Sequence, residues 1–487
     1  MNPTTPTRRL VRHSASYLVG QGLFFLSRVV FFCAFTRLFT PDSYGYLNLI
    51  TSAMLFCIVG ARLGQNDALL RFLPEYEKRG QAKEYVASVM TATLAFAAGV
   101  VALLLYGAHW VADSFQLTGD LRWALYLATP IVGLRVGFDL TYAILRSREL
   151  PNEAVASDVA RNWLTLLASL AILVAWGAAL SPFFVGQLAG EFLVFAACLW
   201  VVARRFSLSP ARFELPLLQE SLRYGLPLVG YHLAAVGLLY VDRPLILAFL
   251  GPHAVGEYSA GYNLAMMVQQ FLTTPMGLAV VPLYMNLWSA GDSEGARAFL
   301  QTTLRWFWLA VWPCLFGMAA VKSDLVVLLA TEKYLESSVV IGYVLLGSVL
   351  YGGYPLYAAG LLVHKKTGTM CMWMLIALAV NVGVNLILIP QFHILGAALA
   401  TLASYSVFCI GSALASRRFL TLRLWPREAT TYLVGAFVMF LAVSAVSLAP
   451  PWASLAAKLA AGVGVYGIWV LAGDGELRKW VLERVRA

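Results

Sequence analysis

The feature that most constrains this chain is a succession of long apolar runs separated by short polar segments. A helix that crosses the hydrocarbon core of a bilayer needs about 20 predominantly apolar residues. Because the runs are continuous rather than alternating, they predict helices and not the strands of a membrane β-barrel. The predicted spans are residues 14–39, 46–64, 86–107, 122–145, 154–176, 182–203, 224–250, 255–285, 303–329, 337–363, 368–389, 394–416, 429–448 and 453–472.

Composition excludes the other classes of protein. Hydrophobic residues make up 60% of the chain and charged residues only 12%, whereas a soluble domain has about 25% charged residues. So few charges could not cover a soluble globule of this size. We therefore predict an all-α integral membrane protein with about 14 transmembrane helices.

The distribution of Lys and Arg predicts the topology. With fourteen spans, 26 of the 35 Lys and Arg residues fall on the side of the membrane that holds both termini. Positive residues are retained on the cytoplasmic side, so residues 1–13 and 473–487 are predicted to be cytoplasmic, in a plasma (bacterial inner) membrane. The basic tail, residues 473–487, is either an amphipathic helix on the inner leaflet or a solvated segment.

No cofactor or metal site is expected. The six cysteines all lie inside apolar runs, and the six histidines are scattered. Neither set has the spacing of metal ligands, and no phosphate-binding loop of the type GxxxxGK[ST] is present. We expect a protein that is not an enzyme.

An internal repeat divides the chain. Pro41 and Gly45 follow the first span, and Pro252 and Gly256 follow the seventh span with the same spacing, 211 residues later. Six spans separate the copies, so both have the same orientation. This predicts two pseudo-symmetric six-helix lobes related by an axis along the membrane normal. The alternative is two unrelated Pro/Gly turns.

The repeat sets the predicted domain boundaries. We expect an N-lobe, a cytoplasmic inter-lobe linker, a C-lobe and an extra helix pair, at residues 14–203, 204–223, 224–416 and 429–472, respectively. Prolines inside spans are concentrated in the C-lobe, and Gly352, Gly353 and Pro355 mark a weak point in the span 337–363. We expect the C-lobe to bend more than the N-lobe during transport.

Four stretches resemble polysaccharide flippases of the Wzx type, which belong to the multidrug/oligosaccharidyl-lipid/polysaccharide exporter superfamily. They are residues 38–46 (LFTPDSYGY), 64–76 (GQNDALLRFLPEY), 224–258 with its GPHAVGEY turn, and 385–401 (NLILIPQFHILGAALAT). Their order and spacing over most of the chain carry the resemblance.

The resemblance implies a fold and a function. The fold is fourteen helices in two lobes around a central cavity. The substrate is a polyprenyl-diphosphate-linked oligosaccharide, moved from the inner to the outer leaflet for O-antigen, lipopolysaccharide or exopolysaccharide biosynthesis. The expected partners are this lipid, the bilayer, a polysaccharide polymerase and glycosyltransferases.

Ionisable residues inside the spans are the candidates for binding such a substrate, because they are costly there and usually mark a pathway. A guanidinium group also matches a phosphate in a bidentate manner. We predict that Arg28, Arg135 and Arg243 bind the diphosphate, and that Asp242 pairs with Arg28 in one conformation. The alternative is that these charges form ordinary pairs that hold the lobes together.

Two further carboxylates lie inside spans. Asp139 follows Arg135 by four residues on one helix face, which favours a permanent internal pair. Glu191 either couples transport to a proton, because a carboxyl group removed from water binds a proton more readily, or it forms a structural ion pair with Arg135.

Other functions are alternatives to the flippase. A multidrug exporter or a peptidoglycan-precursor exporter of the same superfamily would have a similar pattern of spans. A membrane-embedded polysaccharide polymerase or ligase is disfavoured, because the predicted external segments are short and no pair of catalytic carboxylates is evident.

Overall fold

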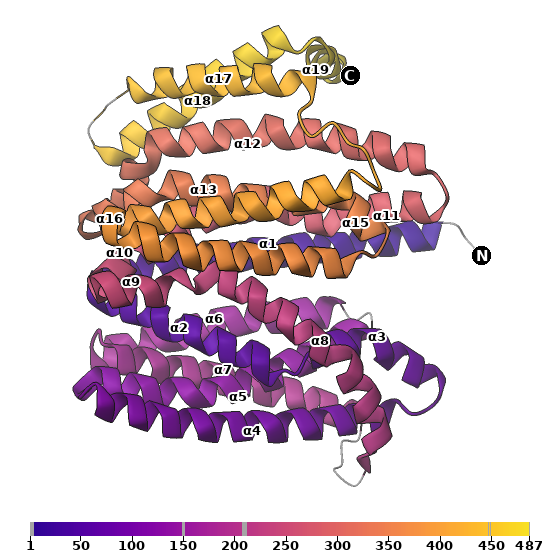
Figure 1. The fold of residues 1–487 in the computed structure, drawn as a ribbon, viewed down its shortest axis with the longest axis vertical. Coiled ribbons are helices and arrows are strands. Elements are labelled where there is room, and N and C mark those ends of the chain that lie inside the picture. The colour runs from indigo at the N-terminus through magenta and orange to yellow at the C-terminus, as the bar shows by residue number, and fades with distance from the viewer. Residues whose placement is uncertain (1–3, 149–150, 207–211, 447, 449, 487) are drawn as a thin grey trace. The chain divides into compact units, whose positions relative to one another are not determined.

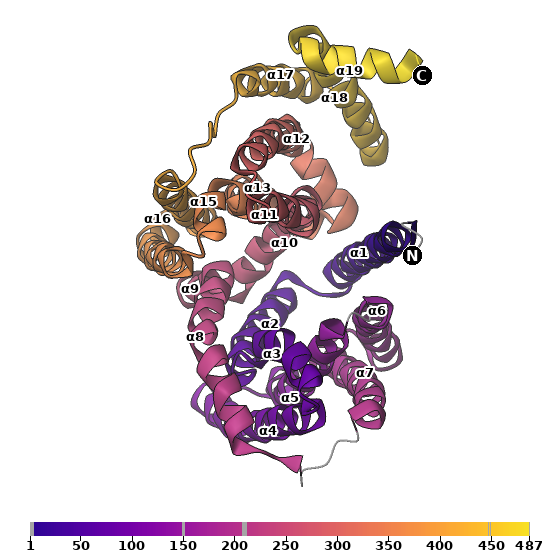
Figure 2. The ribbon, with the colours of Figure 1, turned by 90° about the vertical axis from the view of Figure 1, so that its right-hand side faces the viewer.

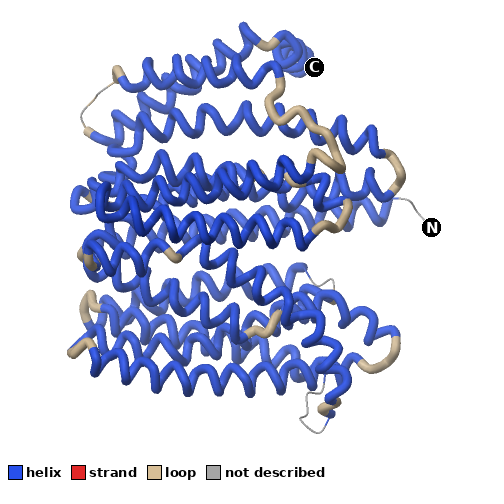
Figure 3. The backbone as a smooth tube through the Cα atoms, in the orientation of Figure 1, coloured by secondary structure: helices blue, strands red, loops and turns tan. Residues whose placement is uncertain are grey.

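The computed structural model describes residues 4–148, 151–206, 212–446, 448 and 450–486, and every regular element in these ranges is a helix (Figure 3). Parts of five predicted segments lie outside the described residues, namely residues 1–3 of the N-terminus, 149–150 of the N-lobe, 207–211 of the linker, 447 and 449 of the extra helix pair, and 487 of the tail. Helices satisfy their own backbone hydrogen bonds, as a chain in hydrocarbon requires. The predicted all-α fold is confirmed.

The first of two compact units comprises Met1–Phe39 and Tyr46–Tyr240. In it α6 and α5 pack on α7, α4 packs on α5, and α1 packs on α6 (Figure 2). The short helix α3 lies against α5 and α8. The helices are α1 (Thr4–Leu38), α2 (Pro41–Ala61, which belongs to this unit from Tyr46 onward), α3 (Gln65–Lys78), α4 (Ala82–Ser114), α5 (Gly119–Ser147), α6 (Pro151–Trp176), α7 (Leu180–Phe206) and α8 (Leu215–Tyr240).

The second unit comprises Thr40–Gly45 and Val241–Ala487. In it α13 packs on α10 and α16, and α12 packs on α13, α17 and α18 (Figure 1). Its helices are α9 (Asp242–Leu250), α10 (Pro252–Pro275), α11 (Val281–Ser289), α12 (Ser293–Leu329), α13 (Ser338–Gly352), α14 (Tyr354–Tyr357), α15 (Ala359–Val363), α16 (Thr367–Ser416), α17 (Arg427–Ser444), α18 (Pro451–Gly473) and α19 (Gly475–Arg486).

All fourteen predicted spans coincide with helical segments. Two of them share α16, where His393 leaves the helical conformation with a φ of 52°. Among the described residues, eleven helices are long and apolar enough to cross a membrane. That number counts α16 once and omits both α17, which has 18 residues, and the interrupted segment from α10 to α11. The chain is thus a multi-pass membrane protein with about fourteen transmembrane helices.

Three spans that were expected to be continuous are broken. The span 224–250 begins earlier, at Leu215, and is interrupted at Val241 between α8 and α9. A π-helical turn at Met276–Val280 interrupts the span 255–285, next to two prolines that cannot donate a backbone hydrogen bond. The span 337–363 stops at Gly352, at the predicted weak point. Whether the C-lobe bends during transport stays a prediction.

Large apolar side chains are exposed on the helices of both units. Leu103, Val174 and Val463 have exposed fractions of 68%, 85% and 76%. In water such surfaces would drive association, but lipid tails solvate them without cost. These faces therefore fit a bilayer environment.

The two copies of the repeated turn contact each other within the second unit. Asp42 Oδ2 and His253 Nδ1, at equivalent positions 211 residues apart, are separated by 3.1 Å. Gly45 lies so close to the carbonyl oxygen of Pro252, and Gly256 so close to that of Pro41, that a Cβ at either glycine would overlap that oxygen. Reciprocal contacts of this kind arise between segments related by a two-fold axis. The two turns of the sequence repeat are therefore also related in the structure. The exact lobe boundaries stay a prediction.

Candidate substrate-binding site

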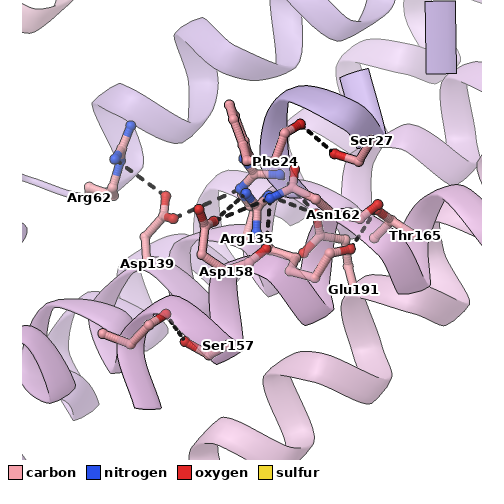
Figure 4. A network of polar contacts seen from close by, with 12 residues as sticks. Phe24, Ser27, Arg62, Arg135, Asp139, Ser157, Asp158, Asn162, Thr165 and Glu191 are labelled. Atoms are coloured by element: carbon pink, nitrogen blue, oxygen red, sulfur yellow. Dashed lines mark hydrogen bonds and ion pairs between the residues drawn. The ribbon is translucent and has the colours of Figure 1, made fainter. Parts of the chain in front are cut away.

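A network of charged side chains lies inside the first unit (Figure 4). We call it the arginine cluster. Helix α5 contributes Arg135 and Asp139, which share one face because they are four residues apart. Helix α6 contributes a second pair, three residues apart, α7 contributes one glutamate, and one arginine follows the end of α2. The cluster consists of Arg62, Arg135, Asp139, Asp158, Arg161 and Glu191.

Glu191 is the buried centre of the cluster. Its side chain is only 1% exposed, and its Oε1 accepts from Nη1 of Arg135 at 2.8 Å and from Nη1 of Arg161 at 3.5 Å. A carboxylate taken out of water needs such partners, because desolvating an unpaired charge costs several kcal/mol. Glu191 thus holds two guanidinium groups in fixed positions.

The outer part of the cluster is more accessible. Arg62 lies 3.3 Å from Asp139, which also lies 3.8 Å from Arg135 on the same helix. The side chains of Arg135 and Arg62 are 31% and 24% exposed. Arg135 lies twelve residues before the end of α5, about 18 Å along the helix axis, which is near mid-depth of a bilayer core of about 30 Å.

Arg28 on α1 belongs to the same region. Its guanidinium lies 5.1 Å from the ring centroid of Phe24, and it interacts electrostatically with Arg161 and Asp158. Helix α1 is fixed to α6 by a hydrogen bond from Trp163 Nε1 to the carbonyl of Leu23 at 3.2 Å. The side chain of Arg28 is exposed. With Arg28, the region holds four guanidinium groups and three carboxylates, so it carries one excess positive charge.

The structure thus brings together four of the six predicted site residues. Arg135 contacts Glu191 and Asp139, as the sequence suggested, and Arg28 lies nearby. Asp158, Arg161 and Arg62 were not among the predicted site residues, but Arg161 reaches Glu191 and Arg62 pairs with Asp139. The spacing of Asp158 and Arg161 was the available signal.

Asp242 and Arg243 lie in the second unit at the start of α9 and are almost fully buried, with side chains 3% and 0% exposed. Arg243 Nη1 donates to Asp242 Oδ1 at 2.9 Å, and the hydroxyl of Tyr258 donates to Asp242. The Arg243 guanidinium stacks over Tyr262 at 4.5 Å from the ring centroid. In this conformation the geometry favours the structural interpretation for this pair. The predicted contact between Asp242 and Arg28 stays a prediction.

Uncharged polar groups in the second unit also have protein partners. Asn381 Nδ2 donates to Ser404 at 3.0 Å, and Asn385 Nδ2 donates to the side chain of Asn381 at 2.9 Å. Amides commonly join membrane helices in this way. Within the described part of the chain, no group of three or more His, Cys, Asp or Glu side chains could hold a metal ion.

Comparison with known proteins identifies the family. Residues 10–288, more than half of the chain, match the family described as "Polysaccharide biosynthesis protein". The chain belongs to this family. The matched residues include the whole arginine cluster, Arg28 and the Asp242–Arg243 pair. A related protein from Methanocaldococcus jannaschii, "Uncharacterized membrane protein MJ1068", is 21% identical over 422 residues, which are 82% of this chain and 81% of that protein.

Solved structures share the fold. The lipid II flippase MurJ in an inward closed conformation superposes with a TM-score of 0.79 over 96% of this chain and 99% of that chain, at 14% identity. An inward-facing multidrug resistance transporter of the MATE family and the MOP superfamily gives a TM-score of 0.65 over 82% of this chain and 94% of that one, also at 14% identity. At these identities the similarity concerns the fold. The resemblance found in the sequence is confirmed for family and fold.

Proposed function

We propose that this member of the polysaccharide biosynthesis family is a flippase. It moves a polyprenyl-diphosphate-linked oligosaccharide from the inner to the outer leaflet by alternating access, for the synthesis of a cell-surface polysaccharide. Both termini lie in the cytoplasm, and the membrane is the bacterial inner membrane. In this proposal the protein carries the lipid without forming or breaking a covalent bond, so it acts as a carrier and not as an enzyme.

The observation that supports this proposal most is the excess of guanidinium groups in and around the arginine cluster. A diphosphate is the part of the substrate that cannot cross hydrocarbon unaided. Guanidinium groups bind it through paired, charge-assisted hydrogen bonds. Arg28 is exposed, and Arg135 is partly exposed at 31% of its side chain. We propose that these two contact the diphosphate directly.

The carboxylates of the cluster have a different role in this proposal. Glu191 and Asp139 keep Arg135 extended between two helices. A substrate diphosphate replaces part of their interaction with Arg135, so the guanidinium keeps an anionic partner when the substrate is bound or released. Asp242 and Arg243 contribute by stabilising the second unit around α9.

The membrane potential supplies a driving force for export. Moving one charge across 100 mV is worth about 2.3 kcal/mol. A diphosphate with about two negative charges therefore gains about 4–5 kcal/mol when it leaves a cell with a negative interior, if its charge crosses uncompensated. Export then needs no coupling ion.

A peptidoglycan-precursor exporter or a multidrug exporter is the alternative function. The excess positive charge disfavours cationic drugs. It does not separate the two lipid-linked substrates, because both carry a diphosphate. A transport assay with both lipids distinguishes the two substrates. If the oligosaccharide lipid is the substrate, a polysaccharide polymerase and glycosyltransferases are the expected partners.

The test is a flipping assay in proteoliposomes that contain polyprenyl-diphosphate oligosaccharides, the lipid-linked peptidoglycan precursor or a cationic dye. We expect the wild-type protein to flip the oligosaccharide lipid and Arg135→Gln to lose that activity. Arg122→Gln is the matched control, because Arg122 pairs with Asp113 outside the cluster at 3.0 Å. Transport of the dye alone would overturn the proposal.

A further inference from the structure

The first unit also contains an open pocket of about 980 Å³ that lies apart from the arginine cluster. It is formed by the ends of α3, α5 and α7, the start of α4, and Arg212 shortly before α8. The predicted topology places all of these at the cytoplasmic face. We call it the basic pocket, because its charged lining residues are four cations and two carboxylates, Lys83, Arg148, Arg205, Arg212, Glu77 and Glu84.

Two of the four cations are already compensated. Arg148 forms an ion pair with Glu77, and its guanidinium stacks over Phe206 at 4.3 Å from the ring centroid. Arg205 Nη2 donates to Oε1 of Glu153 at 2.8 Å. These contacts hold Arg148 and Arg205 in place at the wall of the pocket.

The other two cations have no such partner. Over the described residues, neither Lys83 nor Arg212 forms an ion pair, and the buried Nη1 of Arg212 has no hydrogen-bond acceptor. A buried donor of this kind is costly unless a ligand or water satisfies it. Among the described lining residues, Glu84 is the one remaining carboxylate, and it opposes two cations. The pocket therefore has a net positive charge.

The start of α4 adds to this positive potential. The helix is 33 residues long, and the side chain of Gln81 at its N-cap makes no capping hydrogen bond. The first-turn N–H groups of a helix carry partial positive charge and bind anions. Ala82, Lys83 and Glu84 in this first turn line the pocket, so an anion there would meet both backbone donors and the Lys83 ammonium.

The position of the pocket relative to the bilayer follows from α7. Trp200 is 56% exposed, and the guanidinium of Arg204 stacks over it at 3.9 Å from the ring centroid. Exposed tryptophans gather at the level of lipid headgroups. Arg205 is the next residue along the chain, so the pocket opens at the level where lipid phosphates lie.

We propose that the basic pocket binds the phosphate of an anionic lipid at the cytoplasmic face of the membrane. Basic pockets between helices on this face are suited to such headgroups. The diphosphate of a lipid-linked precursor offers the same chemistry, so it is a second source of the ligand. The proposal concerns the pocket alone and does not depend on which substrate the protein transports.

Native mass spectrometry of the full-length protein in detergent tests the proposal, with phosphatidylglycerol added as the probe and phosphatidylcholine as the neutral comparison. We expect the wild-type protein to retain phosphatidylglycerol preferentially. The double variant Lys83→Gln, Arg212→Gln should lower its affinity about tenfold or more, because it removes both cations that lack a carboxylate partner.

The matched control is Lys365→Gln, Arg423→Gln, which removes the same two residue types from the same predicted face of the second unit and should leave lipid retention unchanged. The charge-conserving variant Lys83→Arg, Arg212→Lys should also retain phosphatidylglycerol, which keeps the test decisive if the neutral variant fails to fold. Equal loss of lipid in the pocket and control variants, or no preference of the wild type for phosphatidylglycerol, would overturn the proposal.

Inorganic pyrophosphate distinguishes the two sources. If it competes with phosphatidylglycerol on the wild-type protein, the pocket recognises the phosphate group itself and can take the diphosphate of a lipid-linked precursor. If it does not compete, the pocket requires an intact lipid headgroup. A wild-type protein that retains phosphatidylglycerol but does not flip the oligosaccharide lipid would contradict the proposed function alone. A wild-type protein that flips the lipid but shows no preference for phosphatidylglycerol would contradict the lipid-binding proposal alone.

Discussion

The two units each place arginines and carboxylates inside membrane-spanning segments, but they use them differently. In the first unit the charges come from four helical segments and form a chain in which two arginines share Glu191. Its outer arginines are partly exposed. In the second unit Asp242 and Arg243 are neighbours in sequence and are enclosed by Tyr258 and Tyr262. In this conformation, therefore, an intramembrane charge is a candidate for substrate contact only if part of its side chain stays accessible.

The largest expected effect lies in the second unit. Arg243→Gln leaves the carboxylate of Asp242 buried without its cation, so it should lower the free energy of unfolding by about 3–5 kcal/mol. Thermal and denaturant unfolding of the detergent-solubilised protein measure the loss. The double variant Arg243→Gln, Asp242→Asn should recover much of it. If Arg243→Gln were as stable as the wild type but unable to flip substrate, Arg243 would have a transport role, and the proposed difference between the two units would be wrong.

The opposite pattern is expected in the first unit. The double variant Arg135→Gln, Glu191→Gln removes both charges of the buried pair, so its stability should stay near that of the wild type. Its flipping rate should fall about tenfold to a hundredfold, since a hydrogen bond to a charged group is worth about 1.5–3 kcal/mol. The proteoliposome assay measures the rate, with Arg122→Gln as control. A double variant with normal flipping would remove Arg135 from the substrate path.

Substitutions in the repeated turn should lower stability through steric overlap alone, without any change of charge. Gly45→Ala and Gly256→Ala should each destabilise the protein by about 1–2 kcal/mol, because each new Cβ meets a backbone oxygen that cannot turn away. If the two copies are equivalent, the two losses should be similar. Unfolding experiments measure them, and Gly342→Ala, which meets no atom within 4 Å, is the control. Unequal losses would show that the two turns do not carry the contact symmetrically.

The smallest effect concerns a carboxylate of the second unit outside the spans. Burial tends to raise the pKa of Asp474, but hydrogen bonds from Arg305, at 2.6 and 2.7 Å, and from Tyr432 outweigh it and lower the pKa below its ordinary value. Its stabilisation is therefore complete above the unfolded-state pKa of about 4 and is lost as the pH falls through the lower folded-state pKa.

Asp474→Asn should cost about 1 kcal/mol at neutral pH, and the difference from the wild type should shrink below about pH 4. Melting temperatures measured over that range check the prediction. Glu476→Gln, at a side chain 80% exposed on the same arginine, is the control and should have little effect. A constant difference between Asp474→Asn and the wild type down to low pH would contradict the assignment.

Much of the fold could be predicted from the sequence, because apolar length and Lys/Arg distribution act locally along the chain. The same signals could not find α3, since Gln65–Lys78 is polar and too short to span. They also did not locate the interruption at Val241, which lies inside one predicted span, although Asp242, Arg243 and Pro244 follow it directly. The predicted pair of Arg135 and Asp139 followed from helical spacing.

The rest of the site depended on packing that no local pattern encodes. Glu191 lies 56 residues from Arg135, and the contact exists because α5 and α7 pack side by side. Arg161 lies within the predicted span 154–176, but its direction toward Glu191 depends on how α6 packs against α7. Residue type thus identified the candidates, and only tertiary structure separated Arg135 from the enclosed Arg243.

The contact between Asp42 and His253 has an evolutionary consequence. If two identical chains met at a dyad in this way, position 42 would face its own copy, and two aspartates would repel each other. Fusing both copies into one polypeptide releases that constraint, because each half can then mutate alone. The present acid–base couple is a bond that a homodimeric ancestor with identical residues there could not have formed.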